Sequence, residues 1–214
     1  MPRNDPQMAV FFTCVVSHVS LLPTLLQLYR RRWMFEVSAT CFGLLCSFLY
    51  HTCQAFDMVI FLTELQWHRL DNVGALVCFS ALFTYLCALR DSTMDAYIKY
   101  GCFMFGIIIQ EKSPWEIEYT LVPVFLFALM PVISHACLFQ RLPHYDWKNF
   151  VVGFGTLVAA FPFFVAGLDD EHDPYRMFHG MWHLMGGVAS LYLWRIVKQP
   201  VATATQAGER LFFD

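Results

Sequence analysis

The sequence of 214 residues contains little charge: charged residues make up only 14% of the chain, against about 25% in an ordinary globular domain. Hydrophobic residues make up 57%, and apolar runs recur from end to end with short polar breaks between them. So few charges cannot cover the surface of a separate water-soluble domain. The composition therefore excludes an ordinary soluble protein and predicts an integral membrane protein.

The chain also lacks an excess of positive charge. Its 14 Lys and Arg residues against 17 Asp and Glu residues give a net charge of -3, which excludes the basic patch of a nucleic-acid-binding protein. Membrane lipids are the expected partners instead. The 8 cysteines lie mainly inside apolar stretches, where a thiol usually packs as a small hydrophobic side chain. A disulfide framework is therefore not expected.

Seven apolar stretches come close to the about 20 residues that a helix needs to cross the hydrocarbon core. We expect an all-α bundle of seven transmembrane helices, over residues 8–29, 34–54, 72–89, 94–110, 119–139, 149–168 and 175–197. They form a single membrane domain, residues 1–198, followed by a short flexible cytosolic tail, residues 199–214. The first stretch lacks the cleavage site of a signal peptide, so we expect it to be retained. The fourth is the weakest, because it contains Lys99, whose amine is expected to extend toward a membrane interface.

Basic residues lie mostly on one side of this bundle. Ten of the 14 fall in the first, third and fifth connections, in the last helix and in the tail. Because cytosolic loops carry an excess of Lys and Arg, the N-terminus is predicted to face the outside or a lumen and the C-terminus the cytosol. The chain is expected in the plasma membrane or a membrane of the secretory pathway.

Two histidines four positions apart interrupt the last apolar stretch, in "FHGMWHLMGG". This spacing places His179 and His183 on one face of a helix. Ser47 and His51 have the same spacing near the end of the second helix, and Asp71 stands at the start of the third. With seven crossings, all five residues lie at the same outer membrane face. A bundle with the fourth stretch outside the membrane would separate them.

Three imidazoles and an acid at one membrane face indicate a metal site. Three neutral imidazoles at about 2.0–2.1 Å from Zn²⁺ leave its fourth position open for water, which is the pattern of a catalytic zinc. We predict that His51, His179 and His183 are the metal ligands. Asp71 is the predicted catalytic acid or base that holds or deprotonates the water, and Ser47 is expected to orient a ligand or to bind a substrate carbonyl. Such a site performs hydrolysis.

Other interpretations of these residues remain open. A histidine within a membrane helix can simply form hydrogen bonds between helices, and a serine commonly bonds to its own helix. His68, three residues before Asp71, is a rival ligand or a residue of the headgroup region. The stretch "DMVIFLTELQW" is too short to span and is expected to lie along the outer surface or over the site. The histidines without an evident role are His18, His135, His144 and His172.

The combination of Ser-x3-His, an Asp at the next helix and His-x3-His in the seventh resembles the CREST superfamily of seven-helix metallohydrolases, which includes adiponectin receptors and alkaline ceramidases. The segments "SFLYHTCQ", "HRLDNVGA" and "FVAGLDDEHDPYRMFHGMWHLMGG" are similar to those of its myomaker and transmembrane-protein-8 family. The resemblance implies a zinc ion held by His51, His179 and His183, with Asp71 and Ser47 close by.

Two functions follow as expectations. The first is a zinc-dependent hydrolase, phospholipase-like or ceramidase-like, that cleaves an ester or amide bond of a lipid at the outer leaflet. The second is a non-enzymatic membrane-remodelling protein of the cell-fusion type with a structural zinc. A G-protein-coupled receptor fits less well because the last helix has no Asn-Pro-x-x-Tyr motif. A proton or metal transporter stays open, since histidines and acids also form relays. Small residues such as Gly153 and Gly186 could pack within one chain or in a homodimer.

Overall fold

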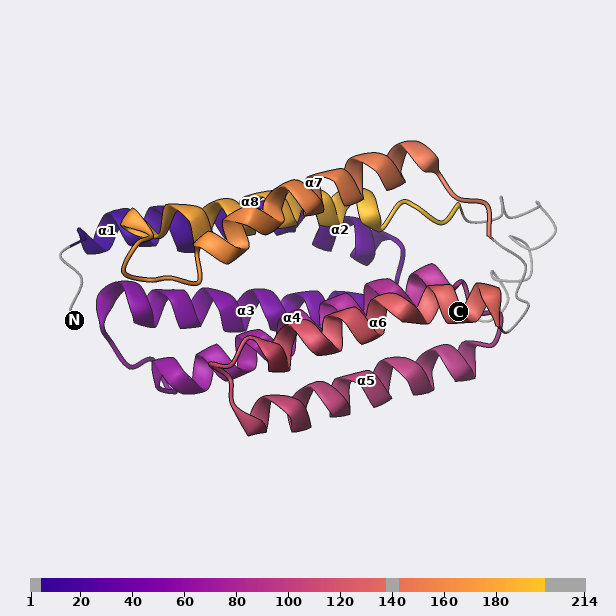
Figure 1. Ribbon diagram of the computed structural model, residues 1–214, viewed down its shortest axis with the longest axis horizontal. Coiled ribbons are helices and arrows are strands. Elements are labelled where there is room, and N and C mark those ends of the chain that lie inside the picture. Colours follow the sequence, from indigo (N-terminus) through magenta and orange to yellow (C-terminus); the bar gives the residue numbers. More distant parts are fainter. Residues whose placement is uncertain (1–4, 138–142, 199–214) are drawn as a thin grey trace.

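The structure is a computed structural model that describes residues 5–137 and 143–198. These residues form a bundle whose helices run close to the long axis of the molecule (Figure 1). No β-strand occurs in these two ranges, where the only β-type pairings are isolated bridges. The predicted all-α class is confirmed for this part of the chain. The expected cytosolic tail, residues 199–214, lies outside the described residues.

The chain begins with one continuous helical segment, Gln7–Arg30, called the first helix below. It consists of α1 (Gln7–Val10), a π-helical turn (Phe11–Val15), a 3₁₀ segment (Val16–Leu21) and α2 (Leu22–Arg30). The helices that follow are α3 (Met34–Phe56), α4 (Glu64–Cys87), α5 (Ser92–Lys112), α6 (Glu118–Ala136), α7 (Trp147–Ala166) and α8 (Met177–Leu193), the last preceded by a 3₁₀ turn (Pro174–Arg176).

Five of these helices are long and apolar enough to cross a membrane: the first helix, α3, α4, α6 and α7. The seven-helix expectation also requires α5 and α8. Helix α8 has 17 residues, about 25 Å at 1.5 Å per residue, which is slightly less than the about 30 Å of a hydrocarbon core. Helix α5 is long enough but carries charged residues at both ends. The structure therefore contains five candidate membrane spans, and the count of seven stays a prediction.

Helix α4 begins at Glu64, eight positions before the start at residue 72 that hydropathy predicted. A capping box causes the early start: Gln66 N–H donates to the Thr63 hydroxyl at 3.4 Å, and Thr63 N–H donates to Gln66 Oε1 at 2.9 Å. The stretch "DMVIFLTELQW" is thus divided between a short loop and the first turn of α4. Asp71 lies about two turns inside this helix instead of at its start.

Helix α5 is held to α3 by a buried group of charges. Lys99 Nζ lies 2.5 Å from Glu36 Oε1 and 2.6 Å from Asp95 Oδ2. Glu36 and Asp95 lie in the first turns of their helices, and Lys99 lies one turn after Asp95, so the three residues meet toward one end of the bundle. Lys99 therefore forms two ion pairs, and its predicted extension toward a membrane interface stays a prediction.

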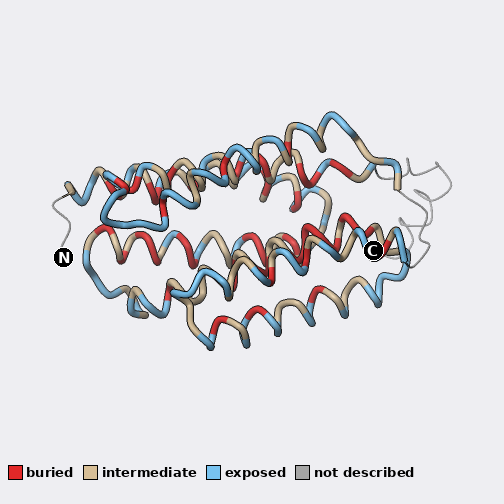
Figure 2. Tube along the Cα trace, viewed as in Figure 1, coloured by how far each residue is buried: buried red, intermediate tan, exposed pale blue. Residues whose placement is uncertain are grey.

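Buried residues lie where the helices face one another, and much of the outer surface is exposed (Figure 2). Large apolar side chains occupy that outer surface. Val158 on α7 is 69% exposed and Phe125 on α6 is 64% exposed. A water-soluble protein rarely exposes so extended an apolar surface, whereas a membrane protein presents one to lipid. The burial pattern agrees with the composition.

Glycines allow two pairs of helices to approach closely. A Cβ built at Gly74 of α4 would lie 2.5 Å from the Cα atom of Gly43 in α3. A Cβ at Gly180 of α8 would lie 2.2 Å from the Thr13 carbonyl oxygen in the first helix. Only glycine fits at these contacts. The contact at Gly180 sets the position of the first helix beside His179 and His183.

Candidate metal centre

The structure brings His51, His179 and His183 together, although His51 is more than 120 residues from the other two in the sequence. His51 Nε2 lies 3.2 Å from His179 Nε2 and 3.2 Å from His183 Nε2. His51 is fully buried near the C-terminal end of α3, and the other two occupy the first two turns of α8. The three rings therefore meet at one end of the bundle.

The spacing of the nitrogens matches a tetrahedral metal site. Two nitrogen ligands, each about 2.0–2.1 Å from a zinc ion, lie about 3.3 Å apart in a tetrahedral arrangement. The two separations that involve His51 are 3.2 Å. These two separations fit nitrogen ligands of a small divalent cation.

The hydrogen bond on the other side of the His51 ring also favours a cation. His51 Nδ1 lies 3.2 Å from Gln54 Oε1, an acceptor, so Nδ1 carries the hydrogen and Nε2 of the neutral ring carries a lone pair. One lone pair accepts a single N–H well, yet two imidazole nitrogens face it at equal distance. A cation that receives a lone pair from each ring removes this conflict.

Cys14 completes the cluster. Its sulfur and the nitrogens of His51, His179 and His183 all lie within 4.8 Å of one another. Cys14 is completely buried in the π-helical turn of the first helix, a form of turn that is frequent at functional sites. Among the described residues, this cluster of one cysteine and three histidines could hold a metal ion. Cys14 was expected to be a packing residue, so its place in this cluster was not predicted.

His18, for which no role was expected, lies directly beside the cluster. Its ring centroid is 4.1 Å from that of His183. Its Nδ1 lies 3.0 Å from the Val15 carbonyl and its Nε2 lies 2.8 Å from the Ser47 hydroxyl. With Nδ1 donating to the carbonyl, Nε2 accepts from Ser47. Both nitrogens are thus occupied, which makes His18 a neighbour of the centre and not one of its ligands.

The two predicted catalytic residues lie next to each other, outside the group of four donors. Ser47 is buried one turn before His51 on α3, and its hydroxyl interacts with the Asp71 carboxyl of α4. Ser47 therefore connects Asp71 with His18, which in turn stacks on His183. His68, the rival ligand, stacks on Trp115 at 4.0 Å between ring centroids and does not belong to the cluster.

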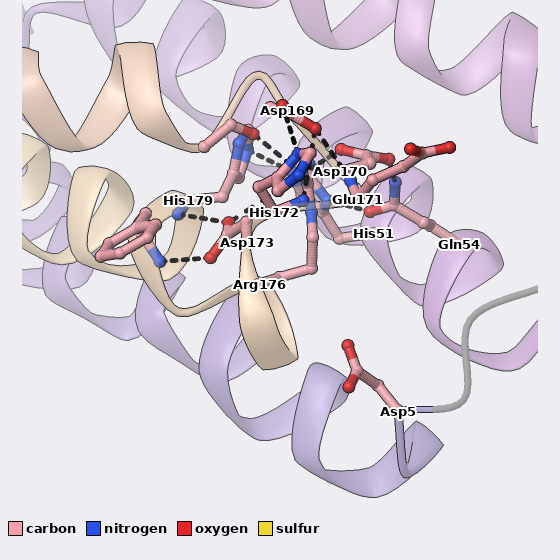
Figure 3. A network of polar contacts seen from close by, with 12 residues as sticks. Asp5, His51, Gln54, Asp169, Asp170, Glu171, His172, Asp173, Arg176 and His179 are labelled. Atoms are coloured by element: carbon pink, nitrogen blue, oxygen red, sulfur yellow. Dashed lines mark hydrogen bonds and ion pairs between the residues drawn. The ribbon is translucent and has the colours of Figure 1, made fainter.

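The loop between α7 and α8 contacts Gln54, the hydrogen-bond partner of His51 (Figure 3). Gln54, the partner of His51, donates to Asp170 Oδ2 at 3.1 Å, and Asp170 also pairs with Arg176. Arg176 Nη1 in turn donates to the Gly167 carbonyl at 2.8 Å. This chain of contacts runs from His51 on α3 to the end of α7. Such outer contacts orient metal ligands and raise metal affinity.

Asp173 fixes the start of α8. It is 1% exposed, and its carboxylate accepts from Phe178 N at 2.8 Å and from His179 N at 3.1 Å. A carboxylate at the N-terminal end of a helix caps the free N–H groups there and complements the helix dipole. Asp173 therefore sets the position of His179. An Asp shortly before a helical stretch is a signal that the sequence already contained.

Two residues of this loop have a left-handed backbone. Tyr175 and Arg176 have φ values of 54° and 55°, which is costly for residues other than glycine. Contacts with the first helix and with the residues before it hold this conformation: the Tyr175 carbonyl accepts from Thr13 Oγ1, and Tyr175 N donates to Asp5 Oδ2 at 3.1 Å. The loop is thereby fixed against the helix that carries Cys14.

The comparisons with known proteins give a family and no function. No curated protein matches the sequence. The sequence profile of a family described as proteins of unknown function, DUF3522, matches residues 6–184. This match covers most of the chain and includes all four residues of the metal cluster, from Cys14 to His183. The chain therefore belongs to the DUF3522 family.

Proposed function

We propose that this chain is a zinc-binding integral membrane hydrolase that cleaves an ester or amide bond of a membrane lipid at the outer leaflet. The observation that carries the proposal is the meeting of three imidazoles, with His51 Nε2 3.2 Å from each of the other two nitrogens, one turn from the Ser47 and Asp71 pair. The resemblance to the CREST metallohydrolases supports the same assignment.

Zinc is the metal that this donor set favours. Imidazole nitrogens, with or without a thiolate sulfur, are the usual ligands of Zn²⁺, whereas Mg²⁺ and Ca²⁺ prefer oxygen ligands. The cluster offers three imidazoles and one thiol within 4.8 Å. When bound, zinc supplies a Lewis acid for a carbonyl oxygen and lowers the pKa of a water molecule toward about 7.

The remaining polar residues supply positioning and proton transfer in this proposal. Asp71 accepts the proton of the attacking water and later returns it to the leaving group. Ser47, in contact with Asp71 and His18, holds these two side chains in place. His18 keeps the neighbouring ring of His183 in place.

An apolar groove beside the centre supports a lipid as substrate. It has a volume of about 420 Å³ and lies between the first helix and α3. Its walls are side chains such as Val15, Leu22 and Phe48, and His18 is the imidazole that lines it. Val19, Leu22 and Phe48 also face outward from the bundle. An acyl chain that entered from the membrane would place its headgroup end beside His18.

The proposed topology has seven crossings, with the N-terminus outside and the C-terminus in the cytosol. Helices α5 and α8 cross the membrane in addition to the five long apolar helices. With seven crossings, the basic loops lie in the cytosol, and His51 and His183 both lie at the outer face. The proposed location is the plasma membrane or a membrane of the secretory pathway. A homodimer is compatible with this topology.

Asp71→Asn is expected to abolish turnover and to leave the metal bound. Protein reconstituted with a panel of phospholipids and ceramides is assayed by mass spectrometry for released fatty acid. Loss of a general base lowers the rate by about 10²–10⁴-fold, whereas zinc content stays near one ion per chain because Asp71 lies outside the donor group. Asp169→Asn, on the exposed loop, is the matched control. If zinc-loaded protein hydrolyses none of these lipids, or Asp71→Asn is fully active, the hydrolase assignment is wrong.

A second candidate function is favoured by Cys14. Structural zinc sites have four protein ligands, whereas catalytic sites keep one position open. A sulfur that binds beside the three imidazoles would complete four ligands and tie the first helix to α3 and α8. Such a zinc is structural, as expected for the membrane-remodelling protein that resembles the myomaker family. Expression on two labelled cell populations should then give mixing of cell contents.

Cobalt substitution distinguishes the two candidates. A thiolate bound to Co²⁺ gives an intense charge-transfer band in the near ultraviolet, and imidazole ligands do not. The membrane-remodelling candidate predicts this band in the wild-type protein, its loss in Cys14→Ala, and no change in Cys41→Ala, whose thiol is exposed on α3. The hydrolase candidate predicts no band and a cobalt spectrum that changes when azide is added, because one position remains open.

A further inference from the structure

We propose a second ligand site at the opposite end of the bundle, where a pocket lined by basic side chains binds the phosphate group of an anionic membrane lipid. This phosphate pocket has a volume of about 630 Å³ and is lined by Arg31, Trp33, Asn149, Arg195, Val197 and Lys198. These residues come from the connection between α2 and α3, the start of α7 and the segment after α8. The metal centre lies at the other ends of α3 and α8.

The positive charge of the pocket is only partly balanced. Arg31 donates to the Trp194 carbonyl at 2.6 Å, and Arg195 donates to Gln27 Oε1 at 2.5 Å. Both acceptors are uncharged, and within the described residues no carboxylate lies within 4.0 Å of either guanidinium. Lys198 has Asp146 at 4.0 Å. One carboxylate against three cations leaves about two positive charges, which suits a phosphate monoester of charge about -1.5 to -2.

The carboxylate that lies near the pocket, Asp146, already accepts a backbone hydrogen bond. Asp146 precedes α7 and accepts from Asn149 N at 3.1 Å. This backbone hydrogen bond lowers the pKa of Asp146, and the charge of Lys198 lowers it further. Asp146 thus serves mainly as the cap of α7, and it contacts only one of the three cations. The two guanidinium groups keep their charge for a ligand.

The Arg31 side chain and the backbone of the segment after α8 are held by contacts within the bundle. The Arg31 guanidinium lies 5.0 Å from the centroid of the Trp33 ring, within the range of a cation–π contact. The segment after α8 is fixed by Val197 N, which donates to the Tyr85 hydroxyl at 2.8 Å, and by Lys198 N, which donates to the His144 carbonyl at 2.9 Å. A site with ordered donors loses less entropy when a ligand binds.

Exposed apolar and aromatic residues beside the pocket point to a lipid as the source of the phosphate. Tyr29 is 63% exposed and Trp147 is 66% exposed, and such aromatic side chains gather at the level of lipid headgroups. Met34 and Val151, at the adjacent turns of α3 and α7, are 58% and 65% exposed and offer an apolar surface for acyl chains. Basic pockets between membrane helices bind phosphorylated headgroups in this way.

Binding of a short-chain lipid by purified protein tests the phosphate pocket. The probes are dioctanoyl phosphatidic acid, dioctanoyl phosphatidylcholine and inorganic phosphate, and native mass spectrometry measures their binding. We expect phosphatidic acid to bind saturably and far more tightly than phosphatidylcholine. Arg195→Gln and Lys198→Gln each weaken it about fivefold, the value for one basic residue at a membrane surface. Both changes together weaken it about 25-fold, if the two contributions add.

The matched control is Arg90→Gln, which removes the same charge from an exposed loop outside the pocket and should leave the affinity unchanged. Equal weakening by Arg90→Gln, or equal affinity for phosphatidylcholine, overturns the proposal. If inorganic phosphate binds as tightly as phosphatidic acid, the lipid as source is overturned. None of these readouts depends on metal, so they are independent of the proposed hydrolase activity.

Discussion

Purified protein is expected to contain about one zinc ion per chain, and His51→Ala is expected to remove it. His51 Nε2 is the nitrogen that lies 3.2 Å from both other imidazoles, so its loss takes a ligand from the middle of the set. Outer partners of a metal ligand typically change affinity about 10–100-fold, and loss of a ligand itself should exceed this. Metal content by mass spectrometry and zinc titration measure the effect. His183→Ala is expected to give the same result independently.

A graded series makes this prediction specific. Gln54→Leu removes the hydrogen bond to His51 Nδ1 and should weaken zinc binding about 10–100-fold without abolishing it. His172→Ala, on a side chain that is 80% exposed, should leave zinc content unchanged. Chelation should lower the melting temperature of the wild-type protein, because a ligand of the folded state stabilises it, and should not affect His51→Ala. Unchanged metal in His51→Ala would refute the metal centre.

Spacing and parity alone predict that the three histidines lie at the same end of the bundle. Residues four positions apart lie on one face of a helix. Four helices, α4 to α7, separate the end of α3 from the start of α8, so His51 and His179 come to the same end of the bundle if every helix crosses it. Neither step requires knowledge of helix packing. Their side chains indeed meet at one end. The zinc and the hydrolytic roles of Asp71 and Ser47 stay predictions.

Cys14 could have been found by the same rule. Cys14 and His18 are four positions apart on the first helix, as are the other two pairs at this end. Their closeness to His183 depends, however, on how the first helix is rotated against α8. Contacts at Gly180 and Gly187 set that rotation, and no spacing within one helix reveals which face of a neighbour it meets.

The bounds of α4 show where hydropathy misleads. Glu64, Gln66 and Arg69 are polar, so the apolar count places the start of the helix at residue 72. The capping box at Thr63 starts it at Glu64 instead, since capping is local chemistry that does not depend on hydrophobicity. The contacts of Gln54 with Asp170 and of Asp170 with Arg176 join segments far apart in the chain, and only the folded arrangement reveals them.

Gly180→Ala is expected to force the first helix away from α8. The added Cβ would lie 2.2 Å from the Thr13 carbonyl oxygen and 2.8 Å from its carbon. These are backbone atoms, so no change of side-chain rotamer relieves the clash, and overpacking of this kind costs about 1–3 kcal/mol or more. The melting temperature in detergent should fall. Because Thr13 adjoins Cys14, the Cys14 sulfur should also move from the cluster. In the structural-zinc candidate, where Cys14 is a ligand, zinc affinity should fall with it.

Alanine substitutions at two other glycines of α8 are controls that distinguish a packing clash from the general effect of alanine on helix stability. Gly186 has no atom within 4 Å of an added Cβ, and alanine favours a helix by about 1 kcal/mol over glycine, so Gly186→Ala should melt at the same temperature or higher. Gly187 lies one turn after His183, and a Cβ there would lie 2.7 Å from the Ser20 backbone carbon. Gly187→Ala should therefore lower the melting temperature, while zinc affinity is largely kept. If Gly180→Ala melts like the wild type and binds zinc equally well, the first helix does not contact α8 at this position, and Cys14 lies outside the metal centre.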